Sequence, residues 1–481
     1  MMLQCLERRS RFVLRLLIPA NARPERLYTA EVIFKHFLGL DLEISPHERS
    51  EVVVTDGGTR HLVLDDCFFG DLDGALLRQD KIPPLPLKKW RAAECGLAAN
   101  LASPDLPVLF GKPLEDGSFI AIQEREIRLG LDVLGSAFFM LSRYEELVSS
   151  ERDKYDRFPA SASVAYKAGF LDRPIVNEYV EILWHCLKHL WSGLQRRPHA
   201  FRIRLSHDVD QPFLLLKNSL PQVARTMAGE AFRRKNPVGA MKRPVQWAAS
   251  RLFGPEFDPV YTFNRIMDLG EHHGLHSAFY FIPSVSAGPP DYRYGIGEPG
   301  IRRLMSDIAA RGHEIGYHAS LETYQDAELI QKELGLLQDA CGKIGVRQPL
   351  NGSRQHYLRV RVPLTLRNLA SAGLAYDTTL GFADHAGFRC GTCWEYPFYD
   401  LEERRTLTIL ERPLIVMECS VMDKQYMGMG AGKETLEYML RLAGHCRRME
   451  GDFTLLWHNT RLVSPRERWV FEELLSVLHA N

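Results

Sequence analysis

The chain has 481 residues, of which 45% are hydrophobic and 25% are charged, proportions typical of a soluble globular protein. Its length predicts two or three domains rather than a single core. Because 60 basic residues balance 60 acidic ones, the net charge gives no argument for a nucleic-acid or anionic-membrane partner, although basic residues gather at 233–235 and 242–243.

The cysteines and the N-terminus bear on the cell compartment. Nine cysteines are scattered without the spacing of a disulfide framework, which favours reduced thiols and a cytoplasmic setting. Arg15 interrupts the apolar run that begins at Phe12, so residues 11–18 are predicted to form a first strand rather than a signal peptide. No run reaches the roughly 20 apolar residues of a membrane span, and we expect none.

The N-terminal part of the chain mixes strand and helix patterns. Strands are predicted at 11–18, 50–54, 61–64 and 106–111, and helices at 28–38, 131–147 and 176–194. This part contains no chemical motif of its own, and a junction is predicted at 196–198. We therefore expect residues 1–197 to form an accessory domain, α/β or α+β, whose role the sequence does not disclose.

Residues 198–481 show strands and helices in alternation. Strands are predicted at 201–205, 277–282 and 453–457, and helices at 260–273, 301–310, 328–341, 363–372 and 467–478. This alternation indicates parallel strands joined by helical crossovers. A polar, basic and helical segment at about 213–257 is expected to be an insertion after the first strand.

Two carboxylates follow the first strand of this second domain. The run Ser206-His207-Asp208-Val209-Asp210 ends an alternating apolar stretch. In α/β folds, the carboxyl ends of strands are where chemistry is found. Asp208 and Asp210 lie two apart on an extended chain, so both side chains are expected to point to the same side.

Histidines stand at two further strand ends. His318 follows a helix stop and a short apolar run, and Glu322 lies four residues later, so one helical turn would place both on a common face. His458 follows the last predicted strand. Carboxylate and imidazole groups are ligands for a divalent metal, and we predict a site formed by Asp210, His318 and Glu322.

The order of these motifs resembles a known family. His-Asp-Val-Asp (207–210), Gly-His-Glu-Ile-Gly-Tyr-His (312–318), Ser-Arg (353–354) and Leu-Leu-Trp-His (455–458) are similar to the motifs of the NodB-homology polysaccharide deacetylases, carbohydrate esterase family 4. The resemblance covers residues 201–481. It implies a distorted (β/α)7 barrel with a divalent metal, commonly zinc. The N-terminal half resembles the uncharacterised domain that precedes this module in some bacterial deacetylase-like proteins.

The resemblance also implies a set of metal ligands. Val209 stands where the family has its metal-binding Asp, so Asp210, one residue later, is the expected substitute. His318 matches the first His of the second motif, and Glu322 stands where the second His belongs. Because Glu is itself a metal ligand, we expect a divalent metal here, with zinc as the first candidate.

The catalytic roles implied by the resemblance fall on three residues. Asp208 is the general base, Arg354 orients it, and His458 is the acid that protonates the departing amine or hydroxyl. We further expect substrate contacts from four residues: His207, Tyr357, Asp384 and Arg389. The last two lie in a polar, glycine-punctuated segment that could equally be an ordinary surface loop.

These patterns lead to three hypotheses. The first is a metal-dependent hydrolase that removes an N- or O-linked acetyl group from a sugar or glycan precursor, with a small molecule or an oligosaccharide as substrate. The second is a hydrolase of non-glycan C–N bonds in amides or ureides. The third is a catalytically inactive glycan-binding module. Nucleic acid is not an expected partner, and the sequence gives no indication of the oligomeric state.

Overall fold

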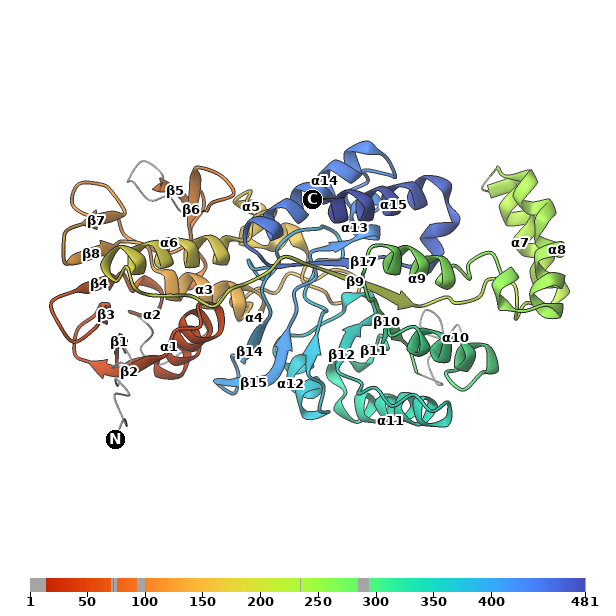
Figure 1. Ribbon diagram of the computed structural model, residues 1–481, viewed down its shortest axis with the longest axis horizontal. Helices are drawn as coiled ribbons and strands as arrows, with labels where there is room; N and C mark the ends of the chain where they lie inside the picture. The colour runs from red at the N-terminus through yellow and green to blue at the C-terminus, as the bar shows by residue number, and fades with distance from the viewer. Residues whose placement is uncertain are drawn as a thin grey trace, which may run out of the picture.

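The computed structural model describes residues 14–70, 72, 76–92, 100–233, 235–283 and 294–480. Residues 11–13 of the first predicted strand and Arg234 of the basic cluster lie outside the described residues. We call residues 14–197 the N-terminal unit and residues 198–480 the C-terminal unit. The two lie side by side, and a long segment of irregular chain runs between them (Figure 1).

The N-terminal unit contains a mixed sheet of six strands. They are β1 (Leu14–Pro19), β2 (Leu42–His47), β3 (Val52–Thr55), β4 (His61–Leu64), β7 (Ile120–Ile122) and β8 (Glu126–Leu129), in the order β2-β1-β3-β4-β8-β7. The pairs β1–β2 and β4–β8 are parallel and the other neighbours are antiparallel. Two further strands, β5 (Lys88–Arg91) and β6 (Asp105–Val108), form a separate antiparallel pair.

Helices of the N-terminal unit follow the predicted patterns, with two differences. They are α1 (Arg23–Ala30), α2 (Cys67–Gly70), α3 (Val133–Leu141), α4 (Tyr144–Val148), α5 (Val164–Lys167) and α6 (Ile175–Leu190). The helix predicted at 28–38 continues α1 as a π-helical segment, Glu31–Phe37. The helix predicted at 131–147 is broken at Arg143, whose φ of 56° is left-handed.

The C-terminal unit is organised around a curled sheet of nine strands (Figure 1). They are β9 (Arg202–Val209), β10 (Ala278–Phe281), β11 (Glu314–Ala319), β12 (Gly352–Gln355), β13 (Tyr376–Asp377), β14 (Tyr396–Asp400), β15 (Arg405–Glu411), β16 (Val416–Met417) and β17 (Asp452–Leu456), in the order β14-β15-β13-β12-β11-β10-β9-β17-β16. All neighbours are parallel except β14 and β15. Among the described residues no pairing joins β14 to β16, so the mixed α/β prediction is confirmed but closure into a (β/α)7 barrel is not shown.

Helices alternate with these strands, as the sequence predicts for parallel crossovers. They are α9 (Phe263–His272), α10 (Pro299–Ala310), α11 (Ala327–Lys343), α12 (Leu364–Ser371), α13 (Glu418–Met422), α14 (Lys433–Arg448) and α15 (Pro465–Ala480). The five helices predicted for this unit are present with ends shifted by a few residues, and α13 and α14 were not predicted.

Two glycines let aromatic rings fill the inside of the curl. A Cβ atom on Gly316 would lie 2.4 Å from the Tyr280 ring, and one on Gly352 would lie 2.3 Å from the Tyr376 ring. The two tyrosine hydroxyls lie 3.0 Å apart within hydrogen-bonding distance. A side chain at either glycine would displace a ring from this core, because interiors are close-packed.

A helical hairpin projects from the C-terminal unit, at the end of the molecule away from the N-terminal unit (Figure 1). It contains α7 (Leu220–Ala228), a π-helical segment (Gly229–Arg233) and α8 (Pro237–Leu252), within the segment predicted to be a helical insertion. No helix in the described part of the chain has the length and apolar character needed to cross a membrane.

Candidate functional site

Neighbouring residues of β9 point to opposite faces of the sheet. His207 is fully buried, its Nδ1–H donates to the carbonyl oxygen of Trp457 over 2.6 Å, and its Nε2 lies 3.3 Å from the Ser277 hydroxyl. Burial lowers the pKa of His207 to about 4, so the ring is neutral. Strand alternation turns this side chain into the core between sheet and helices, so His207, predicted to contact substrate, does not line the cavity beside Asp208.

Asp208 points into the curl and is held by an arginine. Arg354 Nη1 lies 2.9 Å from Asp208 Oδ1 and 3.0 Å from the Ser206 hydroxyl, and both charged side chains are at most 5% exposed. The guanidinium also donates through Nε to the carbonyl oxygen of Thr378. These contacts fix one carboxylate oxygen of Asp208 and leave Oδ2 directed towards His318, 3.5 Å away.

Three side chains converge beside Asp208: Asp210, His318 and His356. His318 Nε2 lies 3.1 Å from Asp210 Oδ1, and His356 Nε2 lies 3.7 Å from Asp210 Oδ2. One ligand atom from each residue lies within 4.8 Å of the others. Burial would raise the pKa of Asp210, but His356, His318 and His458 outweigh it and hold the pKa well below its usual value.

The protonation of His318 indicates that this cluster suits a cation. Its Nδ1 lies 2.8 Å from the carbonyl oxygen of Arg354, which can only accept, so Nδ1 carries the hydrogen. In the neutral ring Nε2 is then a lone pair aimed at the carboxylate of Asp210. Within the described residues, Nε2 and Asp210 Oδ1 are both buried without a hydrogen-bond partner. Such a pair of acceptors, with the other ring nitrogen bonded to a backbone carbonyl, fits a divalent metal.

Glu322 does not join this cluster. Its side chain is 70% exposed and pairs with Arg359 over 3.1 Å. The prediction assumed a helical turn between His318 and Glu322, but His318 lies on β11 and Glu322 in the loop beyond it. The third member of the cluster is instead His356, which follows β12 and which the sequence reasoning missed. Its place two residues after Arg354, at the carboxyl end of the next strand, is the signal that could have identified it.

His458 lies beside this cluster and is held by a buried glutamate. Its Nδ1–H donates to Glu418 Oε1 over 2.6 Å, and its Nε2 lies 3.5 Å from Asp210 Oδ2. Burial would lower the pKa of His458, but Glu418 and Cys419 outweigh it and raise the pKa well above its usual value. Glu418, in α13, has no motif in the sequence and was not predicted.

Glu418, Cys419 and His458 also lie close enough together to hold an ion. Arg461 occupies this position, however, with Nη2 2.9 Å from the Cys419 sulfur and Nε 3.8 Å from Glu418 Oε1. A guanidinium at that distance opposes binding of a second cation. Of the two clusters found among the described residues, Asp210, His318 and His356 are therefore the one better suited to a cation.

A cavity of about 160 Å³ opens between these groups. Its lining includes Asp208, Asp210, His356 and His458 from the C-terminal unit. Tyr357, one of the predicted substrate-contacting residues, also lines it. The N-terminal unit contributes Arg157, whose Nη1 donates to the carbonyl oxygen of Tyr357 over 2.8 Å. The N-terminal unit therefore takes part in building this site.

The other two predicted substrate contacts lie elsewhere. Arg389 is 2% exposed and forms a two-pronged ion pair with Glu146 of the N-terminal unit, the shorter contact being 2.6 Å. Asp384 accepts the backbone N–H of Ala160. Neither lines the cavity beside Asp208. Both hold the two units together, because the glycine-punctuated segment packs against the N-terminal unit rather than over the site.

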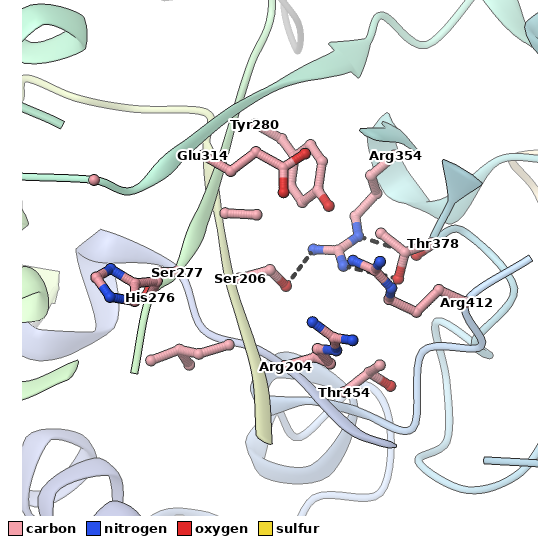
Figure 2. A pocket seen from close by; sticks show the side chains of 13 residues that line it. Arg204, Ser206, His276, Ser277, Tyr280, Glu314, Arg354, Thr378, Arg412 and Thr454 are labelled. Atoms are coloured by element: carbon pink, nitrogen blue, oxygen red, sulfur yellow. Dashed lines mark hydrogen bonds between the residues drawn. The ribbon is translucent and has the colours of Figure 1, made fainter. Parts of the chain in front are cut away.

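A larger cavity of about 250 Å³ lies inside the curl, nearer the amino ends of the strands. Figure 2 shows Arg204, Arg354 and Arg412 gathered around it, with Arg354 donating to Ser206. Arg204 is paired with Asp452 and Arg412 with Glu395, and Glu314 accepts from the Tyr376 hydroxyl. The charged side chains named here are already paired with one another or with neighbours. Among the described residues, no metal-binding cluster lines this cavity, whereas one lies at the cavity of about 160 Å³.

Comparisons with known proteins leave both units without an assigned function. A family of unknown function, DUF7033, matches residues 14–192. No curated protein matches the chain. Solved structures resemble it over part of its length, among them three whose TM-scores all lie below 0.5.

The first is a protein from Mycobacterium smegmatis assigned as a polysaccharide deacetylase, with 17% identity over 59% of this chain and 85% of that one, and a TM-score of 0.39. The second is Puue allantoinase, with 14% identity over 59% of this chain and 88% of that one, and a TM-score of 0.36. The third is Agd3, a carbohydrate deacetylase, with 11% identity over 64% of this chain and 54% of that one, and a TM-score of 0.33.

Proposed function

We propose that this protein is a metal-dependent hydrolase that removes an acetyl group from a sugar or glycan precursor. The observation that carries the proposal is the convergence at one small cavity of Asp208, held by Arg354, of the Asp210–His318–His356 cluster, and of His458. When bound, a divalent ion at that cluster supplies a Lewis acid for a carbonyl oxygen.

The side chains of this protein supply the proton transfers. Asp208 Oδ2 accepts a proton from the attacking water, while Arg354 keeps Oδ1 in place. His458 Nε2–H then donates a proton to the departing nitrogen or oxygen. Glu418 accepts from Nδ1–H throughout, which orients the ring and stabilises its charged form.

The size of the cavity favours a small acyl group. Pockets that enclose drug-sized ligands measure about 300–1,000 Å³. A cavity of about 160 Å³ therefore admits the reacting acetyl or amide group, with the rest of the substrate outside. This geometry suits a glycan, whose sugar rings would lie at the mouth, beside Tyr357.

Turnover of acetylated sugars tests the proposal. With zinc, cobalt or manganese supplied, the wild-type protein should release acetate from N- or O-acetylated sugars. Asp208→Asn should lower kcat by about 10²–10⁴-fold, because a general base is lost, while the metal stays bound. Glu322→Gln, a carboxylate change at an exposed side chain away from the cavity, should keep wild-type activity.

A parallel panel of formamides and ureides separates the alternatives. Turnover of ureides alone would support the assignment as a hydrolase and contradict the assignment of a sugar as its substrate. No turnover of any substrate by the metal-loaded protein, together with measurable sugar binding, would favour a glycan-binding module. Wild-type activity in Asp208→Asn would end the catalytic assignment.

A further inference from the structure

The helical hairpin between β9 and α9 is the most basic part of the chain. Residues 213–257 contain eight Lys and Arg and only two acidic residues, Glu230 and Glu256, for a net charge of +6. The whole chain has a net charge of zero, so the rest of the protein carries −6. Charge is therefore strongly segregated onto one projecting element (Figure 1).

The outer face of α8 is apolar. Four exposed side chains, which we call the apolar stripe, follow helical spacing: Val238, Met241, Val245 and Leu252. They are 63%, 77%, 71% and 75% exposed. Intervals of three, four and seven residues place all four on one side of the helix. Phe253, directly after α8, and Phe232, in the π-helical segment before it, are 70% and 82% exposed and extend the apolar surface.

The hairpin does not need this stripe for its own packing. The opposite face of α8 is buried through Ala240 and Arg243, and Arg243 forms a buried ion pair with Glu230 over 2.9 Å. The Trp247 indole N–H donates to the carbonyl oxygen of Asn218 over 2.8 Å. These contacts fix α8 on the segment before it and leave the stripe facing outwards.

We infer that the hairpin docks on an anionic lipid surface. Exposed basic side chains flank the stripe: Arg225, Lys235, Lys242 and Arg251. A helix with apolar residues on one face and Lys and Arg beside them lies in a membrane interface, with its apolar face about 5–10 Å deep and its basic groups among lipid phosphates. The hairpin docks as a peripheral element and crosses no bilayer.

Charge argues against a second copy of this chain as the occupant. Two hairpins that met stripe to stripe would bring +6 against +6, and like charges at an interface oppose association. An anionic lipid surface offers acyl chains to the apolar stripe and phosphates to the basic side chains beside it. The hairpin begins three residues after Asp210, at the carboxyl end of β9, which is also the edge of the sheet where the small cavity lies.

Vesicle flotation of the full-length protein tests this inference, which does not depend on the proposed hydrolase. Wild type should float with vesicles of mixed phosphatidylglycerol and phosphatidylcholine, should not float with phosphatidylcholine alone, and should be released by high salt. The double variant Met241→Asp/Val245→Asp should bind at least about ten-fold more weakly, because two apolar contacts are replaced by negative charges. Lys242→Gln should weaken binding about five-fold.

Ile122→Asp is the matched control, because Ile122 is also an exposed apolar residue, 39% exposed, but lies in the N-terminal unit. It should bind vesicles like wild type, and all variants should keep the wild-type Tm. The inference would be overturned if wild type did not bind anionic vesicles, or if the double variant bound them as well as wild type. So would self-association of wild type that the double variant abolishes, without vesicle binding, because that result assigns the stripe to a second copy.

Discussion

His207 and Asp208 are adjacent in the chain and lie in opposite environments. Asp208 faces the inside of the curl, where Arg354 stabilises its charge. His207 faces the helices, lies against the rings of Phe279 and Phe471, and has a pKa lowered to about 4 by burial. The same strand therefore carries a carboxylate that lines the cavity and an imidazole that is buried in its neutral form.

This environment predicts a pH dependence of stability. The folded-state pKa of His207, about 4, lies below the ordinary value of 6.5, so the stabilisation is complete above pH 6.5 and is lost as the pH falls towards 4. The loss should approach roughly 1.4 kcal/mol per pH unit within that window. Urea unfolding at a series of pH values measures it.

His207→Asn is the control, because an amide can replace the hydrogen bond to Trp457 without titrating. Carboxylates titrate in both proteins, so their contribution cancels when the unfolding free energies of wild type and this variant are subtracted. The remaining difference should change between pH 6.5 and pH 4. A difference that stays constant from pH 7 to pH 4 would contradict the neutral buried imidazole.

At the residue scale, the sequence was informative where a motif coincided with a strand end. Asp208 and His458, two of the residues singled out by motif, line one cavity, and Arg354 pairs with Asp208. Glu418 and His356 were missed because their roles depend on the meeting of segments distant in sequence. Glu322 was misplaced because its spacing from His318 was read as helical when the chain there leaves a strand.

At the scale of elements, a short segment of the N-terminal unit reaches the cavity beside Asp208. Tyr155 packs against Tyr357 with ring centroids 4.8 Å apart, and Arg157 is anchored by Asp153 while it donates to the Tyr357 backbone. Tyr357 has a φ of 63°, a conformation that L-residues adopt only when the surroundings impose it. Arg157 is therefore a positioning residue for the wall of the cavity.

Arg157→Lys should disturb this wall while keeping the positive charge. A lysine cannot hold Asp153 and the Tyr357 carbonyl at once, so kcat/KM should fall about ten-fold, which corresponds to the loss of one hydrogen bond to a charged group. The bound metal should be unchanged. Arg152→Lys, at an exposed arginine of the same segment, should behave like wild type. Equal kcat/KM in both variants would show that the segment does not position the site.

Prediction of elements succeeded for long periodic helices and for short apolar strands such as β4 and β10, and failed for strands that are very short or polar. The helices at 176–194, 328–341 and 467–478 appear as α6, α11 and α15, because an apolar stripe over several turns is an unambiguous signal. Strands β13 and β16 have two residues each, and β12 contains Gly, Ser, Arg and Gln, so neither length nor alternation marks them. Their place in the sheet is set by tertiary pairing.

At the scale of the whole molecule, a buried ion network joins the two units. Glu146 is paired with Arg143 over 2.8 Å and with Arg389 over 2.6 Å, and all three side chains are at most 2% exposed. Burial would raise the pKa of Glu146, but Arg389 and Arg143 outweigh it and lower the pKa to about 2. The glutamate is therefore charged, and both arginines are required to compensate it.

Arg389→Met should destabilise the full-length protein by about 3 kcal/mol, because it leaves Glu146 buried with only one partner. Chemical denaturation measures this change. Arg265→Met is the control: Arg265 pairs with Glu472 at the surface, its side chain is 51% exposed, and its loss should cost less than about 1 kcal/mol. Similar small changes in both variants would show that the network does not hold the units together.

The junction at about residue 197 stays a prediction drawn from the change in sequence pattern. Arg389 was predicted to contact substrate and was given no partner, whereas the structure pairs it with the buried carboxylate of Glu146. Only the folded arrangement shows that they meet, since they are separated by more than 240 positions in the sequence.

Bound metal, measured by elemental analysis, tests the central claim most directly. Wild-type protein purified without chelator, or reconstituted with zinc, cobalt or manganese, should contain close to one equivalent. His318→Ala and His356→Ala should lose it, whereas Glu322→Ala should retain it, because Glu322 pairs with Arg359 outside the cluster. Metal that is absent from reconstituted wild type, or that is lost from Glu322→Ala and kept in His356→Ala, would contradict the assignment of Asp210, His318 and His356.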